Sequence, residues 1–247
     1  MPSIQGSTVL IIGGSSGIGY GVAAKCIAEG ARVHIASSNE FKVNSSVQSL
    51  KDTTAGGDAP VFGHVCDLSS RDVERNLEQL LSAVDGPIDH IVFTAGDSLA
   101  IAPLDTINLD MIHKAGQVRF AAPLLTAKLA PRFMRPGYQS SLTLTTGAGS
   151  ERPHPNWSLI AGYLTGLHGL TRNLALDLKP LRVNLVSPGA VVTPMWGEKG
   201  PSDDLKNHTT LGKLGTPEEV AEAYVYLMKD TNATGSCIST NGGSLLV

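Results

Sequence analysis

The chain has few cysteines, few aromatic residues and no large excess of charge of either sign. Its three cysteines, Cys26, Cys66 and Cys237, are odd in number and widely spaced, which argues against a disulfide framework. They are set among apolar residues, so we expect buried free thiols in a reducing cytoplasm. The net charge of −3 gives no reason to expect a nucleic-acid partner.

Long hydrophobic runs are also missing. The tightest apolar cluster, TVLII at 8–12, has the length of a strand and is too short to cross a bilayer. The first residues lack a basic segment followed by a cleavage site. We therefore expect a cytoplasmic protein with a small-molecule substrate, without a membrane partner and without a metal site.

What is present fits one globular α/β unit over 1–247, with 42% apolar and 17% charged residues. Short β-branched runs alternate with longer helical patterns, which predicts a doubly wound, mostly parallel sheet of about seven strands flanked by helices on both faces. Apolar runs predict strands at 8–13, 32–37, 60–66, 90–96, 141–146, 182–189 and, as a candidate seventh, 236–240. Helical patterns cover 17–29, 69–84, 108–134, 158–179 and 217–229.

A glycine-rich loop follows the first strand and leads directly into a helix. In IIGGSSGIGYG, Gly13, Gly17 and Gly19 are spaced so that the backbone can turn tightly and approach a pyrophosphate at the helix N-terminus. Ser15, Ser16 and Ile18 complete this loop. The strand–turn–helix context predicts a Rossmann-like dinucleotide-binding fold.

The end of the second strand bears on the choice of dinucleotide. Sites that prefer NAD usually have an acid here for the ribose 2′-hydroxyl. This chain has Ser37, Ser38 and Asn39, whose hydroxyl and amide groups can donate to a 2′-phosphate. Glu40 is the competing acid, although it fits better in the first turn of the next helix. We therefore expect NADP(H) in preference to NAD(H).

Several further motifs occur in order along the chain and together resemble those of the short-chain dehydrogenase/reductase family. They are the glycine loop, CDLS at 66–69, TAG at 94–96, RVNLVSPG at 182–189, VVTPM at 191–195 and GTPEEVA at 215–221. The resemblance implies that Asp67 and Leu68 flank the adenine and that Ala95 and Gly96 lie beside the ribose. It implies that the nicotinamide is held by Pro188, Gly189, Val191 and Thr193.

The catalytic tetrad of that family is Asn, Ser, Tyr and Lys. Carried over by position, it becomes Gln117, Thr146, Ile160 and Leu164, and no lysine occurs between Lys128 and Lys179. A general acid contributes about 10² to 10⁴-fold, so ketone reduction by the usual route should be badly impaired. An iminium ion needs no proton on an oxyanion, so its reduction tolerates this loss.

Other side chains could take over part of the lost role. Trp157 could offer its ring face to a cationic substrate, although it could equally be an ordinary packing residue. His154, between two prolines, could act as acid or base, although a surface histidine is the ordinary alternative. Tyr163 is the reserve proton donor. Gln117 and Arg119 project about 200° apart at a rotation of about 100° per residue, so only one can face the site squarely.

The loop PHPNW at 153–157 resembles a fungal branch of the family, the reductase/Diels–Alderases of the malbrancheamide and paraherquamide types of alkaloid pathway. That branch carries Pro-Asp-Pro-Gly-Trp and uses NADPH on a dipeptide-derived aldehyde or iminium before a cycloaddition. Pro153, Pro155 and Trp157 match its motif, and Arg119 aligns with its arginine, while His154 replaces the Asp and Asn156 the Gly. A reductase, a cyclase and a non-catalytic dinucleotide-binding protein are therefore the three hypotheses.

The resemblance also implies assembly through the two long helices at 108–134 and 158–179. Small residues along the second of them, at Ala161, Gly162, Gly166 and Gly169, would allow close helix approach. We expect a homodimer or homotetramer. The segment 196–209 is rich in Gly, Pro and charge, so we expect a substrate lid that is mobile until a ligand closes it.

Overall fold

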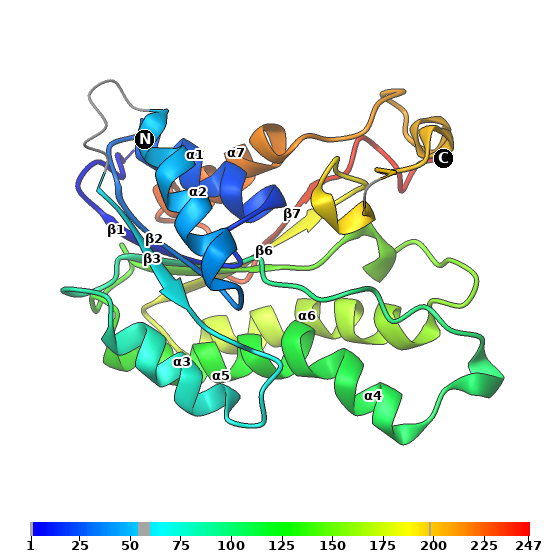
Figure 1. Ribbon diagram of the computed structural model, residues 1–247, viewed down its shortest axis with the longest axis horizontal. Coiled ribbons are helices and arrows are strands. Elements are labelled where there is room, and N and C mark those ends of the chain that lie inside the picture. The colour runs from blue at the N-terminus through cyan, green and yellow to red at the C-terminus, as the bar shows by residue number, and fades with distance from the viewer. Residues whose placement is uncertain (1, 54–59, 198) are drawn as a thin grey trace.

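The computed structural model describes residues 2–53, 60–197 and 199–247, and its centre is a seven-stranded sheet (Figure 1). All strand pairs are parallel, in the order β3-β2-β1-β4-β5-β6-β7. The strands are β1 Thr8–Ile12, β2 Arg32–Ser37, β3 Val61–Val65, β4 His90–Phe93, β5 Ser141–Thr145, β6 Arg182–Pro188 and β7 Cys237–Thr240. The predicted Rossmann-like, doubly wound fold is confirmed.

Helices cover the sheet on both faces (Figure 1). One face carries α1 Gly17–Ala28, α2 Glu40–Asp52 and α7 Pro217–Lys229; the other carries α3 Val73–Ser82, α4 Leu109–Gly116, α5 Ala122–Leu129 and α6 Ser158–Asp177. Because side chains alternate along a strand, Val9 and Ile11 of β1 enter one apolar cluster, and Leu10 and Ile12 enter the other. Within the described ranges, no helix is long and apolar enough to cross a membrane.

The long helix expected over 108–134 is interrupted. After α4, a wide π-helical turn η2 (Gln117–Ala121) precedes α5, and a 3₁₀ turn η3 (Ala130–Arg132) follows it. Pro123, near the start of α5, has no N–H to donate to the carbonyl four residues earlier, so the regular α-helical ladder cannot run through this region. The interruption changes the directions in which the side chains of residues 117–121 point.

The cysteine prediction holds for two of the three thiols. Cys26 and Cys66 are buried, and burial raises the pKa of Cys26 to about 12. Cys237 is exposed because β7 is an edge strand, with only β6 beside it in the sheet. The expectation of a buried thiol at Cys237 is therefore wrong.

Two buried histidines predict a pH dependence of stability. His34 of β2 and His90 of β4 are 2% and 4% exposed, and burial lowers the pKa of each to about 4. Between about pH 6.5 and 4, the unfolded chain binds protons at these rings and the folded chain does not. Acidification through this window should therefore lower the free energy of unfolding, by up to about 3 kcal/mol for each ring.

Urea unfolding at about pH 7 and about pH 4.5 measures this loss. A His34→Gln variant keeps a hydrogen-bonding side chain opposite His64, whose Nε2 lies 2.9 Å from the His34 Nδ1, but it removes one titrating ring. It should lose less stability on acidification than the parent protein. An equal loss in both proteins would contradict the assignment to His34.

Candidate active site

The glycine loop lies against the end of β4 through close backbone contacts. Gly13 has φ +96°, and a Cβ on it would lie 2.4 Å from the Ala95 nitrogen. A Cβ on Gly19 would lie 2.2 Å from the Gly13 oxygen. A Cβ on Gly17 would come 3.1 Å from the Thr193 Cγ2. Side chains at these positions would fill the cradle, so the structure has the form that a pyrophosphate-binding loop requires.

The N-terminus of α1 is open to an anion. Ser16 is its N-cap residue but makes no side-chain capping bond, and no acidic residue lies in the first turn. The first N–H groups of a helix have no partners within it, and the helix dipole favours negative charge there. Behind the loop, the Ser46 hydroxyl donates to the Ser15 carbonyl at 2.8 Å and supports its shape. These residues therefore fit a dinucleotide phosphate.

At the end of β2, Ser37 is half-buried, and Ser38 and Asn39 are exposed. The Asn39 Oδ1 accepts from the Lys42 backbone N–H at 2.9 Å and so caps α2. Because the amide caps through its oxygen, its NH₂ group is still able to donate to a ligand. Glu40 is the first residue of α2, where its charge suits the helix dipole.

Beyond β3, Gln117 has a different place from the one that the tetrad alignment suggests. Its Nε2 donates to the carbonyls of Leu68 and Ser70 at 3.3 and 3.2 Å. The Asp67 Oδ1 accepts from Ser69, so this segment forms a tight turn of its own. Gln117 therefore supports the turn assigned to the adenine, and its interpretation as an amide beside the reacting atoms is corrected. The wide turn of η2 and the acceptors on Leu68 and Ser70 account for this direction.

On the nicotinamide side, the chain after β6 is fixed by close contacts. A Cβ on Gly189 would lie 2.8 Å from the Asn241 backbone, and Val191 forms a parallel bridge with Gly215. The Trp196 Nε1 donates to the Val191 carbonyl at 2.8 Å. The segment assigned to the nicotinamide, Pro188 to Thr193, is thus held at both ends.

That tryptophan begins the segment 196–209 expected to be a lid. The 3₁₀ helix η6 (Asp203–His208) forms its second half, and Glu198 lies outside the described residues. Its closure on a ligand stays a prediction.

The two positions that carry Tyr and Lys in the tetrad are occupied by core side chains. Ile160 is fully buried and Leu164 is 5% exposed. Thr146 keeps a hydroxyl, but its Oγ1 donates to the Leu164 carbonyl at 2.7 Å. The Thr146 proton is therefore engaged with the backbone of α6, and the oxygen can act toward a substrate only as an acceptor.

Tyr163 does not face the tetrad positions. Its hydroxyl donates to the Ile112 carbonyl of α4 at 2.8 Å. Its ring lies against Gly116 and has its centroid 5.8 Å from that of Phe120. The missing Cβ of Gly116 gives the ring this space, so Tyr163 joins α6 to α4. The expectation that it is a reserve proton donor is corrected for this reason.

Arg119 reaches the end of β4. Its Nε lies 2.9 Å from the Asp97 Oδ1, and the guanidinium also donates to the Asp97 carbonyl. A Cβ on Gly96 would lie 3.0 Å from two guanidinium nitrogens, so a side chain there would require the guanidinium to shift. Burial lowers the pKa of Arg119, and the Asp97 carboxylate opposes that shift. A cation thus lies beside the residues assigned to the ribose.

His154 and Trp157 form a pair in the loop between β5 and α6. Their ring centroids are 4.9 Å apart, with the planes tilted by 47°. Trp157 is half-buried and covers Gly149, where a Cβ would lie 2.7 Å from the indole Cζ3. His154 is exposed; partial burial lowers its pKa, and the charges of Arg152 and His208 act in the same direction. These effects favour the neutral form of the imidazole.

Asn156 has φ +65°, in the left-handed region that glycine adopts freely and asparagine tolerates better than most residues. Its carbonyl accepts from the Ala102 N–H at 3.1 Å, which ties the loop to the segment after β4. The exchange of glycine for asparagine in the motif therefore preserves the backbone turn. His154 is the exchange that changes the chemistry.

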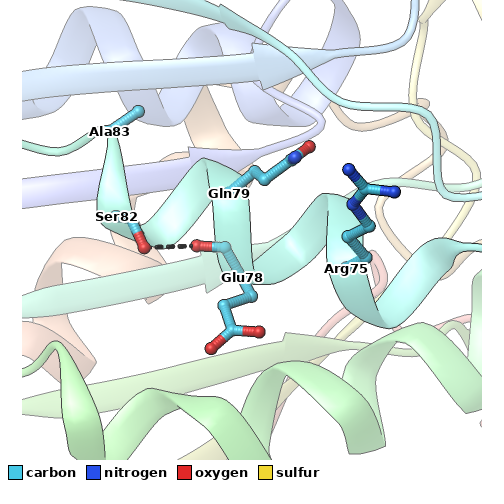
Figure 2. A pocket seen from close by; sticks show the side chains of 5 residues that line it. All are labelled: Arg75, Glu78, Gln79, Ser82 and Ala83. Atoms are coloured by element: carbon cyan, nitrogen blue, oxygen red, sulfur yellow. Dashed lines mark hydrogen bonds between the residues drawn. The ribbon is translucent and has the colours of Figure 1, made fainter.

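A hollow elsewhere on the surface is less suited to catalysis. Figure 2 shows it on α3, lined by Arg75, Glu78, Gln79, Ser82 and Ala83. The Ser82 hydroxyl donates to the Glu78 carbonyl within the helix, and the Glu78 carboxylate pairs with Arg132 at 2.7 Å. Such pairs are typical of a solvated helix face, and the hollow lies away from the glycine loop.

Comparison with known sequences places the chain in a family of dinucleotide-binding folds. The family model described as an SDR-like Rossmann domain matches residues 3–247. The short-chain dehydrogenase/reductase malC of Malbranchea aurantiaca is 44% identical, over 98% of this chain and 96% of the relative. The short-chain dehydrogenase/reductase fsr5 of Gibberella fujikuroi is 43% identical over the same shares.

Solved structures lead to the same family. The MalC reductase/Diels–Alderase of Malbranchea aurantiaca superposes with a TM-score of 0.92 at 44% identity, covering 99% of this chain and 98% of that one. A short-chain dehydrogenase of Burkholderia cenocepacia, solved with NADP, gives 0.86 at 25% identity over 98% and 99% of the two chains. The expected resemblance to the fungal branch is confirmed, and the fold is one that binds a nicotinamide dinucleotide. The chain belongs to the short-chain dehydrogenase/reductase family.

Proposed function

We propose that the protein is an NADP(H)-dependent reductase whose substrate is an imine, an iminium ion or an activated carbonyl of secondary metabolism. The observation that carries the proposal is the missing proton donor. Ile160 and Leu164 replace the Tyr–Lys pair as buried aliphatic side chains, and the Thr146 proton is held by the Leu164 carbonyl. A substrate that is already cationic accepts a hydride without a proton on an oxyanion.

The roles of this chain's residues follow from their placement. When bound, NADPH supplies a hydride to the electrophile. The glycine loop and the α1 N-terminus would hold its phosphates, and Arg119 would lie beside its ribose. The Trp157 face attracts a cationic substrate, and the neutral His154 can accept an N–H from it.

The test is calorimetric titration with NADPH, NADP⁺, NADH and NAD⁺, followed by NADPH oxidation with a cyclic imine and the ketone of the same ring. The imine should react faster than the ketone by about 10² to 10⁴-fold, since the imine takes up its proton from water before it binds, whereas the ketone needs the missing acid. Equal rates on both substrates would contradict the proposal. Tight binding of NADP⁺ with turnover of neither would favour a cyclase or a non-catalytic protein.

The proposed preference for NADP(H) predicts the effect of Asn39→Asp. Aspartate caps a helix as well as asparagine does, so α2 should be unaffected. The new carboxylate repels a 2′-phosphate and accepts from a 2′-hydroxyl. We expect the Kd for NADPH to rise about tenfold, or about 1.4 kcal/mol, while the Kd for NADH falls. Asn39→Ser, which keeps both a cap and a donor, is the matched control; equal losses in both variants would argue against the charge effect.

A cyclase of the Diels–Alder kind is the second candidate, because the relative at 44% identity is named a reductase/Diels–Alderase. In this chain, His154, whose pKa is lowered by burial, stands at the motif position of an Asp, whose carboxylate could pair with a cationic diene. A cyclase would work with NADP⁺ bound and consume no NADPH. Cyclisation of a suitable azadiene by the parent protein, strengthened in His154→Asp, would favour this candidate over the reductase.

We also propose a homodimer or homotetramer through α4, α5 and α6. Leu109 of α4 and Leu124 of α5 expose apolar surface, and nothing lies within 4 Å of a Cβ built on Gly162 or Gly169 of α6. These features allow two helix pairs to approach closely. Light scattering that gives the mass of one chain would contradict the proposal.

A further inference from the structure

The segment 240–244 runs past the candidate site and contacts three of its walls. Gly189, at the nicotinamide-side turn, donates its N–H to the first carbonyl of the segment at 3.1 Å. The Thr210 hydroxyl, just beyond the predicted lid, donates to the Gly242 carbonyl at 3.0 Å. Arg152, one residue before the PHPNW motif, donates from a guanidinium nitrogen to the Ser244 carbonyl at 2.5 Å.

The PHPNW motif is otherwise fixed at its two ends. At its base, the Thr165 hydroxyl of α6 donates to the Ser150 carbonyl at 2.7 Å. At its far end, the Asn156 carbonyl accepts from the Ala102 N–H. Arg152 lies between these two ties; its backbone N–H donates to the Ala148 carbonyl at 2.9 Å, and its side chain provides a third tie. This third tie leads to the segment that also holds Gly189, so it connects the His154–Trp157 pair with the nicotinamide-side turn.

The Arg152 side chain has no competing ion pair in the part of the chain that the structure describes. The recorded contact of its guanidinium is the Ser244 carbonyl, which is a geometric anchor and not a charge partner. On the segment side, Gly243 has φ +75°, and a Cβ on it would lie 2.0 Å from the Thr210 Oγ1. The segment can therefore keep its position only with glycine at 243.

We propose that Arg152 is a positioning residue: anchored on Ser244, it fixes His154 and Trp157 relative to the turn at Gly189. Its value for catalysis rests on the proposed function, whereas the geometry of the ring pair can be measured without any turnover. Two variants break the anchor from opposite sides. Arg152→Met removes the donor, and Gly243→Ala displaces the segment while keeping the Arg152 charge.

Tryptophan fluorescence reports the geometry. The chain has two tryptophans, so a Trp196→Phe background leaves Trp157 as the emitter. A protonated imidazole quenches an indole in contact with it, and the two rings lie 4.9 Å apart. Lowering the pH from about 7.5 to about 5 should quench the Trp157 emission as His154 takes up a proton. The depth of quenching measures contact between the rings, and the midpoint measures the local charge.

We expect Arg152→Met and Gly243→Ala to lose most of the quenching. Arg152→Lys, which keeps a cationic donor, should retain it. The control Gly86→Ala, a strained glycine with nothing within 4 Å of its Cβ, should also retain it. The pH at the midpoint of the remaining quenching should rise in Arg152→Met. It should stay in place in Gly243→Ala, because only Arg152→Met removes a charge. Full quenching in Gly243→Ala would overturn the proposal, and this variant decides alone if Arg152→Met fails to fold.

Kinetics give the second measurement. In Arg152→Met, misplacement of the ring pair should lower kcat for imine reduction by about 10- to 100-fold, with the Kd for NADPH unchanged because the segment beside Gly189 stays in place. An unchanged kcat combined with lost quenching would overturn the role of the anchor in catalysis. If no variant and no parent protein reduces an imine, the proposed function fails, and the fluorescence comparison still decides whether Arg152 positions the pair.

Discussion

Gly19→Ala should weaken dinucleotide binding by more than about 100-fold, or about 2.7 kcal/mol. A Cβ on Gly19 would lie 2.2 Å from the Gly13 oxygen and 2.5 Å from the Thr94 Oγ1. Backbone cannot yield as a flexible side chain can, so the first turn of α1 must move away from the loop. The N–H groups that would face the pyrophosphate then lose their alignment.

Calorimetry with NADPH and NADP⁺ measures the loss, and circular dichroism shows whether the fold is kept. Gly86→Ala is the matched control, because no atom lies within 4 Å of its Cβ and it precedes β4, at the end of the sheet opposite the glycine loop. Binding should be unchanged there, while the left-handed backbone at φ +84° should lower the free energy of unfolding by about 1 to 2 kcal/mol. Normal binding by Gly19→Ala would show that the phosphates bind elsewhere.

The largest loss of stability should come from Arg182→Met. Arg182 is 3% exposed at the start of β6, and all its recorded hydrogen bonds go to backbone carbonyls. The acceptors belong to Tyr138, Gln139, Leu227, Met228, Asp230 and Ala233. Methionine fills similar space but removes the Arg182 donor from these oxygens, of which only the Ala233 and Asp230 carbonyls keep another recorded donor among the described residues, from Asn184 and from the Ala233 N–H, at a cost of about 3 to 5 kcal/mol.

Thermal unfolding should show a decrease in Tm of about 10 °C for Arg182→Met, given about 2 to 4 °C for each kcal/mol in a chain of this size. Arg182→Lys should fall between it and the parent protein, because lysine keeps the charge but has fewer donors. Arg75→Met, on the exposed face of α3, should change stability by less than about 0.5 kcal/mol. A small change in Arg182→Met would mean that water replaces the lost donors. NADPH affinity should be unaffected, since Arg182 lies at the N-terminal ends of the strands and the glycine loop lies at their C-terminal ends.

Much of the fold follows from local patterns. The run TVLII predicts β1 because its side chains are apolar on both faces, and the structure buries Val9 through Ile12 in two clusters. The glycine spacing identifies the loop because a glycine is required at these positions only where one stretch of backbone packs directly against another. Thr216 and Glu219 form a capping box at α7, which agrees with the predicted helix start. Each of these features depends on neighbours in the sequence.

The directions of the site side chains could not be predicted in the same way. The Gln117 amide is drawn to carbonyls at Leu68 and Ser70, and the Tyr163 hydroxyl to one at Ile112. These acceptors are remote in sequence, and the π turn of η2 alters the helical rotation that the sequence analysis assumed. The proline at 123 was the available signal for that interruption. The left-handed Asn156 could be anticipated only from the glycine at this place in the related motif.

The buried Ile160 and Leu164 have a consequence for the direction of the reaction. A conventional carbonyl reductase also catalyses the reverse reaction, oxidation of the alcohol, because the residue that donated a proton to the carbonyl can accept one from the alcohol. With two hydrocarbon side chains in those places and the Thr146 hydroxyl already donating to the Leu164 carbonyl of α6, an alcohol lying over the cofactor would meet no base at the tetrad positions. An amine formed from an iminium ion could still return its hydride to the oxidised cofactor, because that reverse step needs no base. Where oxidised cofactor is abundant, the site would then oxidise suitable amines and leave alcohols unreacted.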